Sequence, residues 1–199
     1  MDIFFNDTPL TVDGIDDETS IADLIELVQQ EVGKNGLTVV DVELDGTKFT
    51  ADDAQLKTSR AGECRSLHLL GATIAELVSQ ALEDREAVFQ HVEKLGRSVS
   101  ESLRIGKVPD AMKQHVELLE GLTWITSILG NLGNAFPEKM AETDLELRRH
   151  ELMTRLGEQM TALHEIQEKQ DWVGMADLLE YELPEILQVG QDFLARFSH

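Results

Sequence analysis

The chain has 199 residues, of which 42% are hydrophobic and 28% are charged, a composition that excludes a disordered chain and suits globular domains. Its 17 Lys and Arg are outnumbered by 38 Asp and Glu, which gives a formal net charge of -21 at pH 7. A chain this acidic is repelled by nucleic-acid phosphates and by anionic lipid headgroups, so nucleic acid and membranes are excluded as expected partners, whereas basic proteins and divalent cations are favoured.

The cysteine count and the hydropathy pattern indicate which covalent links and which cellular location to expect. Cys64 is the single cysteine, so neither an intramolecular disulfide nor a cysteine-based zinc site can form. The N-terminal stretch lacks the basic region and apolar run of a signal peptide. The most apolar stretch, residues 122–132, is far shorter than the roughly 20 residues that span a bilayer. The sequence therefore predicts a soluble, cytoplasmic protein.

The first third of the chain begins with the pattern of a hairpin followed by a helix. Apolar residues 3–5, the turn residues Asn6-Asp7 and the alternating stretch 10–12 predict two strands joined by a tight turn. Ser20 is suited to cap a helix over residues 19–32, in which apolar side chains recur every three or four positions.

Further strands follow this helix. Residues 37–44 are rich in β-branched side chains, Asp45-Gly46 predicts a hairpin turn, and residues 47–50 continue the hairpin. The stretch 66–70, SLHLL, predicts a closing strand.

This order of elements resembles the ubiquitin-like β-grasp fold. MDIF at the start of the chain and SLHLL at the close of residues 1–71 are similar to the corresponding segments of ubiquitin. Ubiquitin-like modifiers use a free C-terminal Gly-Gly, but here the closing strand runs into Gly71-Ala72 and the chain continues. The resemblance therefore implies a β-grasp module that serves as a binding platform rather than as a modifier.

The remainder of the chain has helical periodicity throughout. Apolar stripes at steps of three and four predict four amphipathic helices, over about residues 74–99, 112–132, 142–169 and 172–197. Short connections between such helices favour an antiparallel bundle. The predicted fold class is α+β, with a ubiquitin-like β-grasp domain at 1–71 followed by an antiparallel four-helix bundle at 72–199.

Residues 170–187, QDWVGMADLLEYELPEIL, combine two aromatic side chains with five carboxylates and no basic residue. Asp171 is placed to cap the last helix, and an apolar stripe begins at Trp172. A proline inside this pattern removes a backbone hydrogen bond, so we expect a kink or a new helical start. The side chains beside the freed carbonyl form a hypothetical docking patch: Asp177, Glu180, Tyr181, Glu182 and Pro184.

No motif for catalysis or for metal binding is present. None of His91, His115, His150 and His164 has a glutamate three residues before it, as a carboxylate-bridged metal bundle requires. Phosphate-binding glycine loops and nucleophile elbows are also absent from the sequence. His115 lies on an apolar stripe and is predicted to be a hydrogen-bonded core histidine. The sequence therefore predicts no catalytic, cofactor-binding or metal-binding residue.

The predicted function is a non-catalytic protein-interaction module, adaptor-like or chaperone-like, that needs no cofactor. It would bind a protein partner of basic character through the β-grasp surface, an acidic face of the bundle, or both. The alternative from another class is a metal-binding or enzymatic helical bundle rich in carboxylates. A homodimer formed through the helices that carry Trp124 and Trp172 also stays open.

Overall fold

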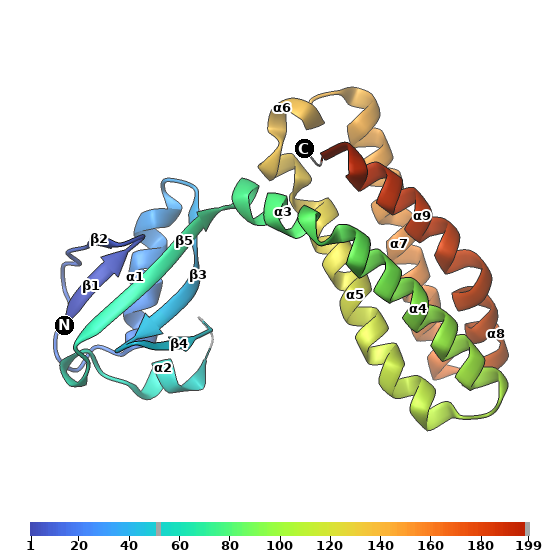
Figure 1. The fold of residues 1–199 in the computed structure, drawn as a ribbon, viewed down its shortest axis with the longest axis horizontal. Coiled ribbons are helices and arrows are strands. Elements are labelled where there is room, and N and C mark those ends of the chain that lie inside the picture. The colour runs from blue at the N-terminus through green and yellow to red at the C-terminus, as the bar shows by residue number, and fades with distance from the viewer. Residues whose placement is uncertain (51–52, 198–199) are drawn as a thin grey trace. The chain divides into compact units, whose positions relative to one another are not determined.

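The computed structural model describes residues 1–50 and 53–197 of the chain. The chain forms two compact units, Met1–Leu77 and Val78–His199. The first unit contains a mixed five-stranded sheet and the second consists of helices, so the protein is α+β as predicted (Figure 1).

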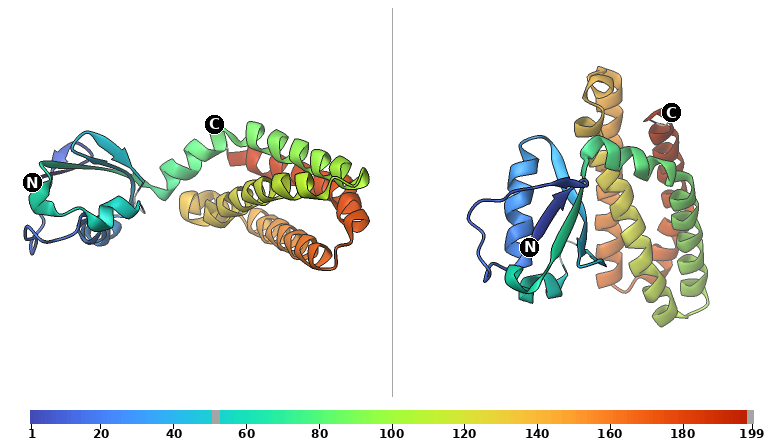
Figure 2. Two further views of the ribbon diagram at one scale, coloured as in Figure 1. Left: turned by 90° about the horizontal axis from the view of Figure 1, so that it is seen from below. Right: turned by 60° about the vertical axis from the view of Figure 1, so that its left-hand side comes forward.

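The sheet of the first unit has the strand order β2-β1-β5-β3-β4. Strands β1 and β5 are parallel, and the other neighbouring pairs are antiparallel. Helix α1 lies against one face of the sheet (Figures 1 and 2). The elements are β1 (Asp2–Phe5), β2 (Thr8–Pro9), α1 (Ile21–Gly33), β3 (Leu37–Leu44), β4 (Thr47–Phe49), α2 (Ala54–Thr58), η1 (Ala61–Glu63) and β5 (Ser66–Thr73).

Helix α1 forms where its capping serine and its apolar stripe predicted it. Ser20 accepts a hydrogen bond from the backbone N–H of Asp23 at 3.1 Å, as an N-cap does. The apolar stripe of the helix is buried against the inward side chains of the sheet, which include Val42 and Leu67. Because successive side chains of a strand point to opposite faces, burial of Leu67 leaves His68 on the face away from α1.

The first hairpin is shorter than predicted. Asn6 and Asp7 both have positive φ, which closes a two-residue turn and pairs Thr8 with β1. Pro9 has no N–H to donate to a ladder, and strand β2 ends there. The strand predicted at residues 10–12 is therefore wrong, although the N–H of Leu10 still donates to the carbonyl of Ile3 at 2.8 Å. The second predicted turn, Asp45-Gly46, does join β3 and β4.

The second unit contains three long helices and a composite C-terminal segment. The first predicted helix of this unit, over residues 74–99, is divided at Asp84 into two helices, α3 and α4. The elements that follow β5 are α3 (Ile74–Glu83), which begins in the first unit, α4 (Arg85–Arg104), α5 (Val108–Ala135), α6 (Pro137–Met140), α7 (Thr143–Glu168), α8 (Trp172–Asp177), η2 (Leu178–Glu182), α9 (Leu183–Leu194) and η3 (Ala195–Phe197). Within residues 1–50 and 53–197, no helix is both long enough and apolar enough to cross a bilayer.

These helices pack around one apolar interior. Helix α4 contacts α5 and also α8 and α9, while α7 contacts α5 and the same C-terminal segment. The side chains that fill the interior lie on the predicted stripes and include Leu122 of α5, Leu156 of α7 and Leu183 of α9. The elements α4, α5, α7 and α8–α9 run alongside one another (Figure 2).

The proline in the last helix changes the helical register rather than ending the helix. The segment η2 is a π-helical turn, in which the N–H of Leu183 donates to the carbonyl of Leu178, five residues earlier. In an α-helix the ring of Pro184 would clash with the carbonyl of Glu180, and the wider turn relieves that clash. Helix α9 starts at Leu183 with Pro184 in its first turn, so the change expected at the proline occurs as a change of helical register.

Helices α4 and α5 approach closely at Gly121. A Cβ atom at Gly121 would lie 2.4 Å from Cγ2 of Val92, a side chain that is stiff because it is β-branched. A Cβ atom at Gly157 on α7, in contrast, would meet no described heavy atom within 4 Å.

We predict that Gly121→Ala and Gly157→Ala change the free energy of unfolding in opposite directions. Forcing a methyl group against Val92 costs roughly 1–3 kcal/mol, which exceeds the gain of about 1 kcal/mol in helix propensity. Gly157→Ala has only that gain and should stabilise by about 0.5–1 kcal/mol. Urea denaturation of both variants measures the difference, and changes of the same sign would contradict the close contact.

Candidate docking surfaces

The sheet face away from α1 carries an exposed leucine beside two half-buried aromatic rings. One row of paired residues crosses all five strands: Pro9, Phe4, His68, Glu43 and Lys48. The rings of Phe4 and His68 are stacked with centroids 4.4 Å apart. Leu70, two residues further along β5, is 50% exposed. We call Phe4, His68 and Leu70 the sheet-face patch.

Carboxylates border the sheet-face patch. Leu70 is paired in register with Asp41, and His68 is paired with Glu43. A hollow of about 290 Å³ lies on this face and is also lined by Asp7. An apolar centre with a polar rim is the usual arrangement of a protein-binding surface, and here the rim is mainly acidic.

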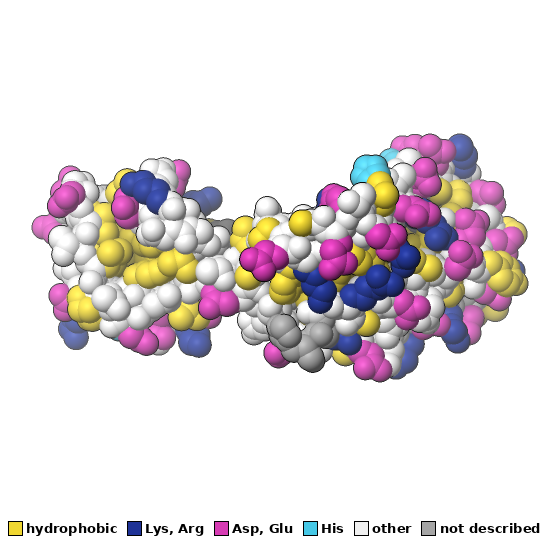
Figure 3. All heavy atoms as spheres, turned by 90° about the horizontal axis from the view of Figure 1, so that it is seen from above, with side chains coloured by type: hydrophobic (Ala, Val, Ile, Leu, Met, Phe, Trp, Pro, Cys, Tyr) yellow, Lys and Arg dark blue, Asp and Glu magenta, His cyan; other side chains and the backbone are white. Residues whose placement is uncertain are grey.

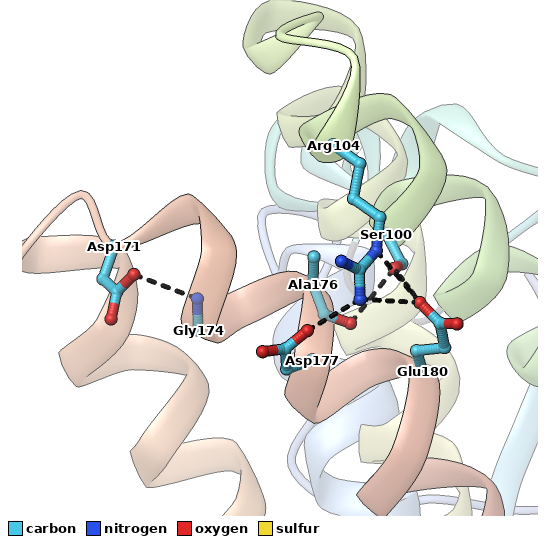
Figure 4. Close-up of polar contacts among 7 residues, drawn as sticks. All are labelled: Ser100, Arg104, Asp171, Gly174, Ala176, Asp177 and Glu180. Atoms are coloured by element: carbon cyan, nitrogen blue, oxygen red, sulfur yellow. Dashed lines mark hydrogen bonds and ion pairs between the residues drawn. The ribbon is translucent and has the colours of Figure 1, made fainter.

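The predicted docking patch on the last helical segment is divided by its own contacts. Asp177 and Glu180 face α4, where Arg104 binds both (Figure 4). The Arg104 Nη2 atom lies 2.7 Å from Oδ1 of Asp177 and 2.9 Å from Oε2 of Glu180. Ser100, which is buried, donates to the carbonyl of Ala176 at 3.0 Å and to Glu180 at 3.2 Å. These two carboxylates therefore hold the C-terminal segment against α4.

Hydrogen bonding to Arg104 also sets the ionisation of this cluster. It lowers the pKa of Glu180, and the hydrogen bond to Asp177, followed by that to Glu180, raises the pKa of Arg104. Both shifts favour the charged forms of Glu180 and Arg104, and Arg104 compensates part of the negative charge that the sequence places in this stretch.

Tyr181 and Glu182 of the predicted patch lie toward α7. Glu182 accepts a hydrogen bond from Nε2 of Gln159 at 3.0 Å, and Pro184 is half-buried. Tyr181 is 66% exposed and lines a hollow of about 250 Å³ together with Glu182 and Glu185. The structure thus brings Tyr181 and Glu182 together but places Asp177 and Glu180 in a separate cluster.

Several local predictions for this segment are confirmed. The carboxylate of Asp171 accepts from the N–H of Gly174 at 2.9 Å, as the predicted N-cap should (Figure 4). The predicted apolar stripe is buried from Ala176 to Phe197, while Trp172 is only half-buried.

His115 on α5 is buried, with 3% of its surface exposed. Its Nδ1 atom has no hydrogen-bond partner among the described residues, so the expected hydrogen bonding at this atom is wrong. Burial lowers the pKa of His115, and the side chain of Gln167 on α7 opposes that shift. The imidazole is therefore neutral in the folded protein at neutral pH.

Metal-binding and thiol chemistry have little support in the described part of the chain. Within residues 1–50 and 53–197, no group of three or more His, Cys, Asp or Glu side chains could hold a metal ion. Burial raises the pKa of the Cys64 thiol, and the neighbouring Asp45 and Glu63 raise it further, which disfavours the reactive thiolate.

The fold is that of an α+β protein with a sheet unit and a helical unit. Each unit exposes a large side chain among polar residues, Leu70 on the sheet and Tyr181 on the last helical segment. Residues 77–191, more than half of the chain, match the family model described as domain of unknown function (DUF8042), and the chain belongs to that family. Residues 1–70 match the model described as the TP0873 N-terminal domain. No curated protein and no solved structure matches the chain.

We predict that His115 makes the free energy of unfolding depend on pH. The pKa of the folded state lies below the usual value of about 6.5, so the unfolded chain binds the proton more readily. The stability of the wild type relative to His115→Leu should therefore fall as the pH is lowered through about 6.5 toward 5. Denaturation at several pH values measures this difference.

The control is His91→Leu, which replaces an exposed histidine that pairs with Glu117. If the free energies of unfolding of the wild type and of His115→Leu change in parallel with pH, the pKa of His115 does not differ between the folded and unfolded states, and the prediction is wrong.

Proposed function

We propose that the protein is a non-catalytic interaction module of the adaptor or chaperone type, composed of a ubiquitin-like β-grasp domain and an antiparallel four-helix bundle. The strand order β2-β1-β5-β3-β4, with α1 across one face, supports the β-grasp assignment. The contacts of α4 and α7, each with α5 and with the α8–α9 segment, support the bundle assignment.

The sheet-face patch is the observation that carries this proposal. Leu70 exposes half of its surface on the face that carries the stacked rings of Phe4 and His68. On the opposite face of the same strand, Leu67 and Leu69 are buried in the core. Aromatic and large apolar side chains at the centre of a polar surface supply most of the binding energy in protein interfaces.

The partner should present apolar side chains surrounded by Lys and Arg. Asp7, Asp41 and Glu43 line the hollow on this face, whereas Lys48 is its one basic lining residue among those described. Such complementarity accelerates association and selects against acidic competitors, and its effect falls with added salt.

The surface around Tyr181 is a second candidate for the same function. Tyr181 is exposed beside the π-helical turn η2, and such turns occur often at functional sites. Of the carboxylates proposed for docking, Glu182 lines the hollow with Tyr181, while Asp177 and Glu180 position the turn from the α4 side.

We predict that Leu70→Ser weakens binding of a protein partner captured from the native lysate by about fivefold or more, since a central apolar contact is worth over 1 kcal/mol. Leu27→Ser is the matched control, because Leu27 is 41% exposed on α1, away from the patch. Both variants should melt within a few degrees of the wild type. Equal binding by the two variants would contradict a role for the sheet-face patch.

We also predict that Tyr181→Ala weakens partner binding without unfolding the protein, because its side chain is exposed and contributes little to the core. Affinity measured beside thermal melting separates the two effects. Equal losses of binding and of stability would assign Tyr181 a structural role, and undiminished binding would remove it from the docking surface.

A further inference from the structure

A groove between α7 and α9 differs from the rest of the surface in its charge. It has a volume of about 430 Å³, within the range of small-molecule sites, and three apolar side chains line it beside five charged ones. Three arginines line it, Arg148, Arg155 and Arg196, although the whole chain has only 17 Lys and Arg. Figure 3 shows Lys and Arg side chains gathered over apolar ones on one face of the helical unit.

The floor and walls of the groove come from regular helical spacing. On α7, Arg148, Leu152 and Arg155 follow steps of four and three, so they share one face over about 10 Å. On α9 and η3, Val189, Phe193 and Arg196 do the same. Leu152 and Phe193 are almost fully buried, whereas Val189 is 43% exposed, so an apolar wall faces the open part of the groove.

The arginines have hydrogen-bonding capacity beyond their pairs within the protein. Nε of Arg148 lies 2.9 Å from Asp144, and Nη2 of Arg155 lies 3.0 Å from Glu185. Each guanidinium has five N–H donors, so one such contact leaves several donors for a further anion. Among the described residues, the guanidinium of Arg196 makes no hydrogen bond or ion pair, and the acidic lining residues are Glu151 and Asp192.

The segment that carries Arg196 is held in place. The ring of Phe197 packs against Phe193 and Phe136, with centroids 5.6 and 5.5 Å away. Lys139 of α6 donates to the carbonyl of Arg196 and lies 5.1 Å above the ring of Phe197. This anchoring positions Arg196 at the edge of the groove before any ligand arrives, which lowers the entropic cost of binding.

We propose that this groove binds a small amphipathic organic anion, with the apolar body on Leu152, Val189 and Phe193 and a carboxylate, sulfonate or phosphate head between Arg148 and Arg196. Guanidinium groups bind such heads through paired, charge-assisted hydrogen bonds. The apolar side chains of the groove favour a ligand with an apolar body, and the positively charged arginines favour a negatively charged head group. The groove adjoins the hollow beside Tyr181, because Arg155 lines both.

The proposal is tested with two fluorescent probes that share an apolar body. Anilinonaphthalene sulfonate carries an anionic head, whereas phenylnaphthylamine is neutral. The full chain should bind the sulfonate saturably with one site per chain, and more tightly than the neutral probe. Arg148→Gln and Arg196→Gln should each weaken sulfonate binding by about three- to tenfold, as expected for loss of one charge-assisted contact, and leave the neutral probe unaffected.

Two further variants locate the site. Val189→Glu places a carboxylate in the wall and should abolish sulfonate binding. Arg97→Gln removes the same charge from an exposed arginine of α4, which pairs with Glu93, and should leave binding unchanged. Equal effects of Arg97→Gln and the groove variants, or equal affinity for both probes, would overturn the proposal.

Discussion

The ring of Pro184 is the constraint on which the C-terminal segment of the helical unit depends. An α-helical register would bring its ring against the carbonyl of Glu180, so the chain widens into the π-helical turn η2. Leu179 lies within the π-helical turn and Leu183 follows it, and both side chains are buried. The wider turn therefore preserves the apolar stripe of the last helical segment. Tyr181 is consequently exposed, and α9 continues along α7 to form one wall of the arginine-lined groove.

Some of the carboxylates that make the chain acidic stabilise the fold by accepting hydrogen bonds from its backbone. Asp45 accepts backbone hydrogen bonds from Ser66 and Arg65, and those bonds lower the pKa of its carboxyl. Glu76 accepts from the backbone of Thr73 at the start of α3, which lowers its pKa in the same way. Carboxylates of this kind satisfy the chain's own donors where strands and helices begin. Net charge alone therefore identifies no binding surface, and the proposed sheet-face surface rests instead on the position of Asp41 and Glu43 beside the exposed Leu70.

Local signals in the sequence predict the elements well, because they act over one or two turns of chain. Ser20 and Asp171 cap the helices that were expected after them, and the stripe through Leu179 and Phe193 is buried. Long-range contacts have no such signal. Arg104 and Glu180 are separated by 76 residues, and only the folded chain shows that this arginine pairs with two carboxylates of the predicted docking patch. The sheet-face patch was open to prediction in part, since alternation along SLHLL already places His68 and Leu70 on one face.

The two exposed apolar regions have rims of opposite character, and this difference separates their ligands. The sheet-face patch is bordered by Asp7, Asp41 and Glu43, which attract basic groups and repel carboxylates at distances within a Debye length of about 8–10 Å. The groove between α7 and α9 places guanidinium groups at both ends of its apolar wall. A basic protein surface is therefore favoured at the sheet and disfavoured in the groove, while an organic anion experiences the reverse.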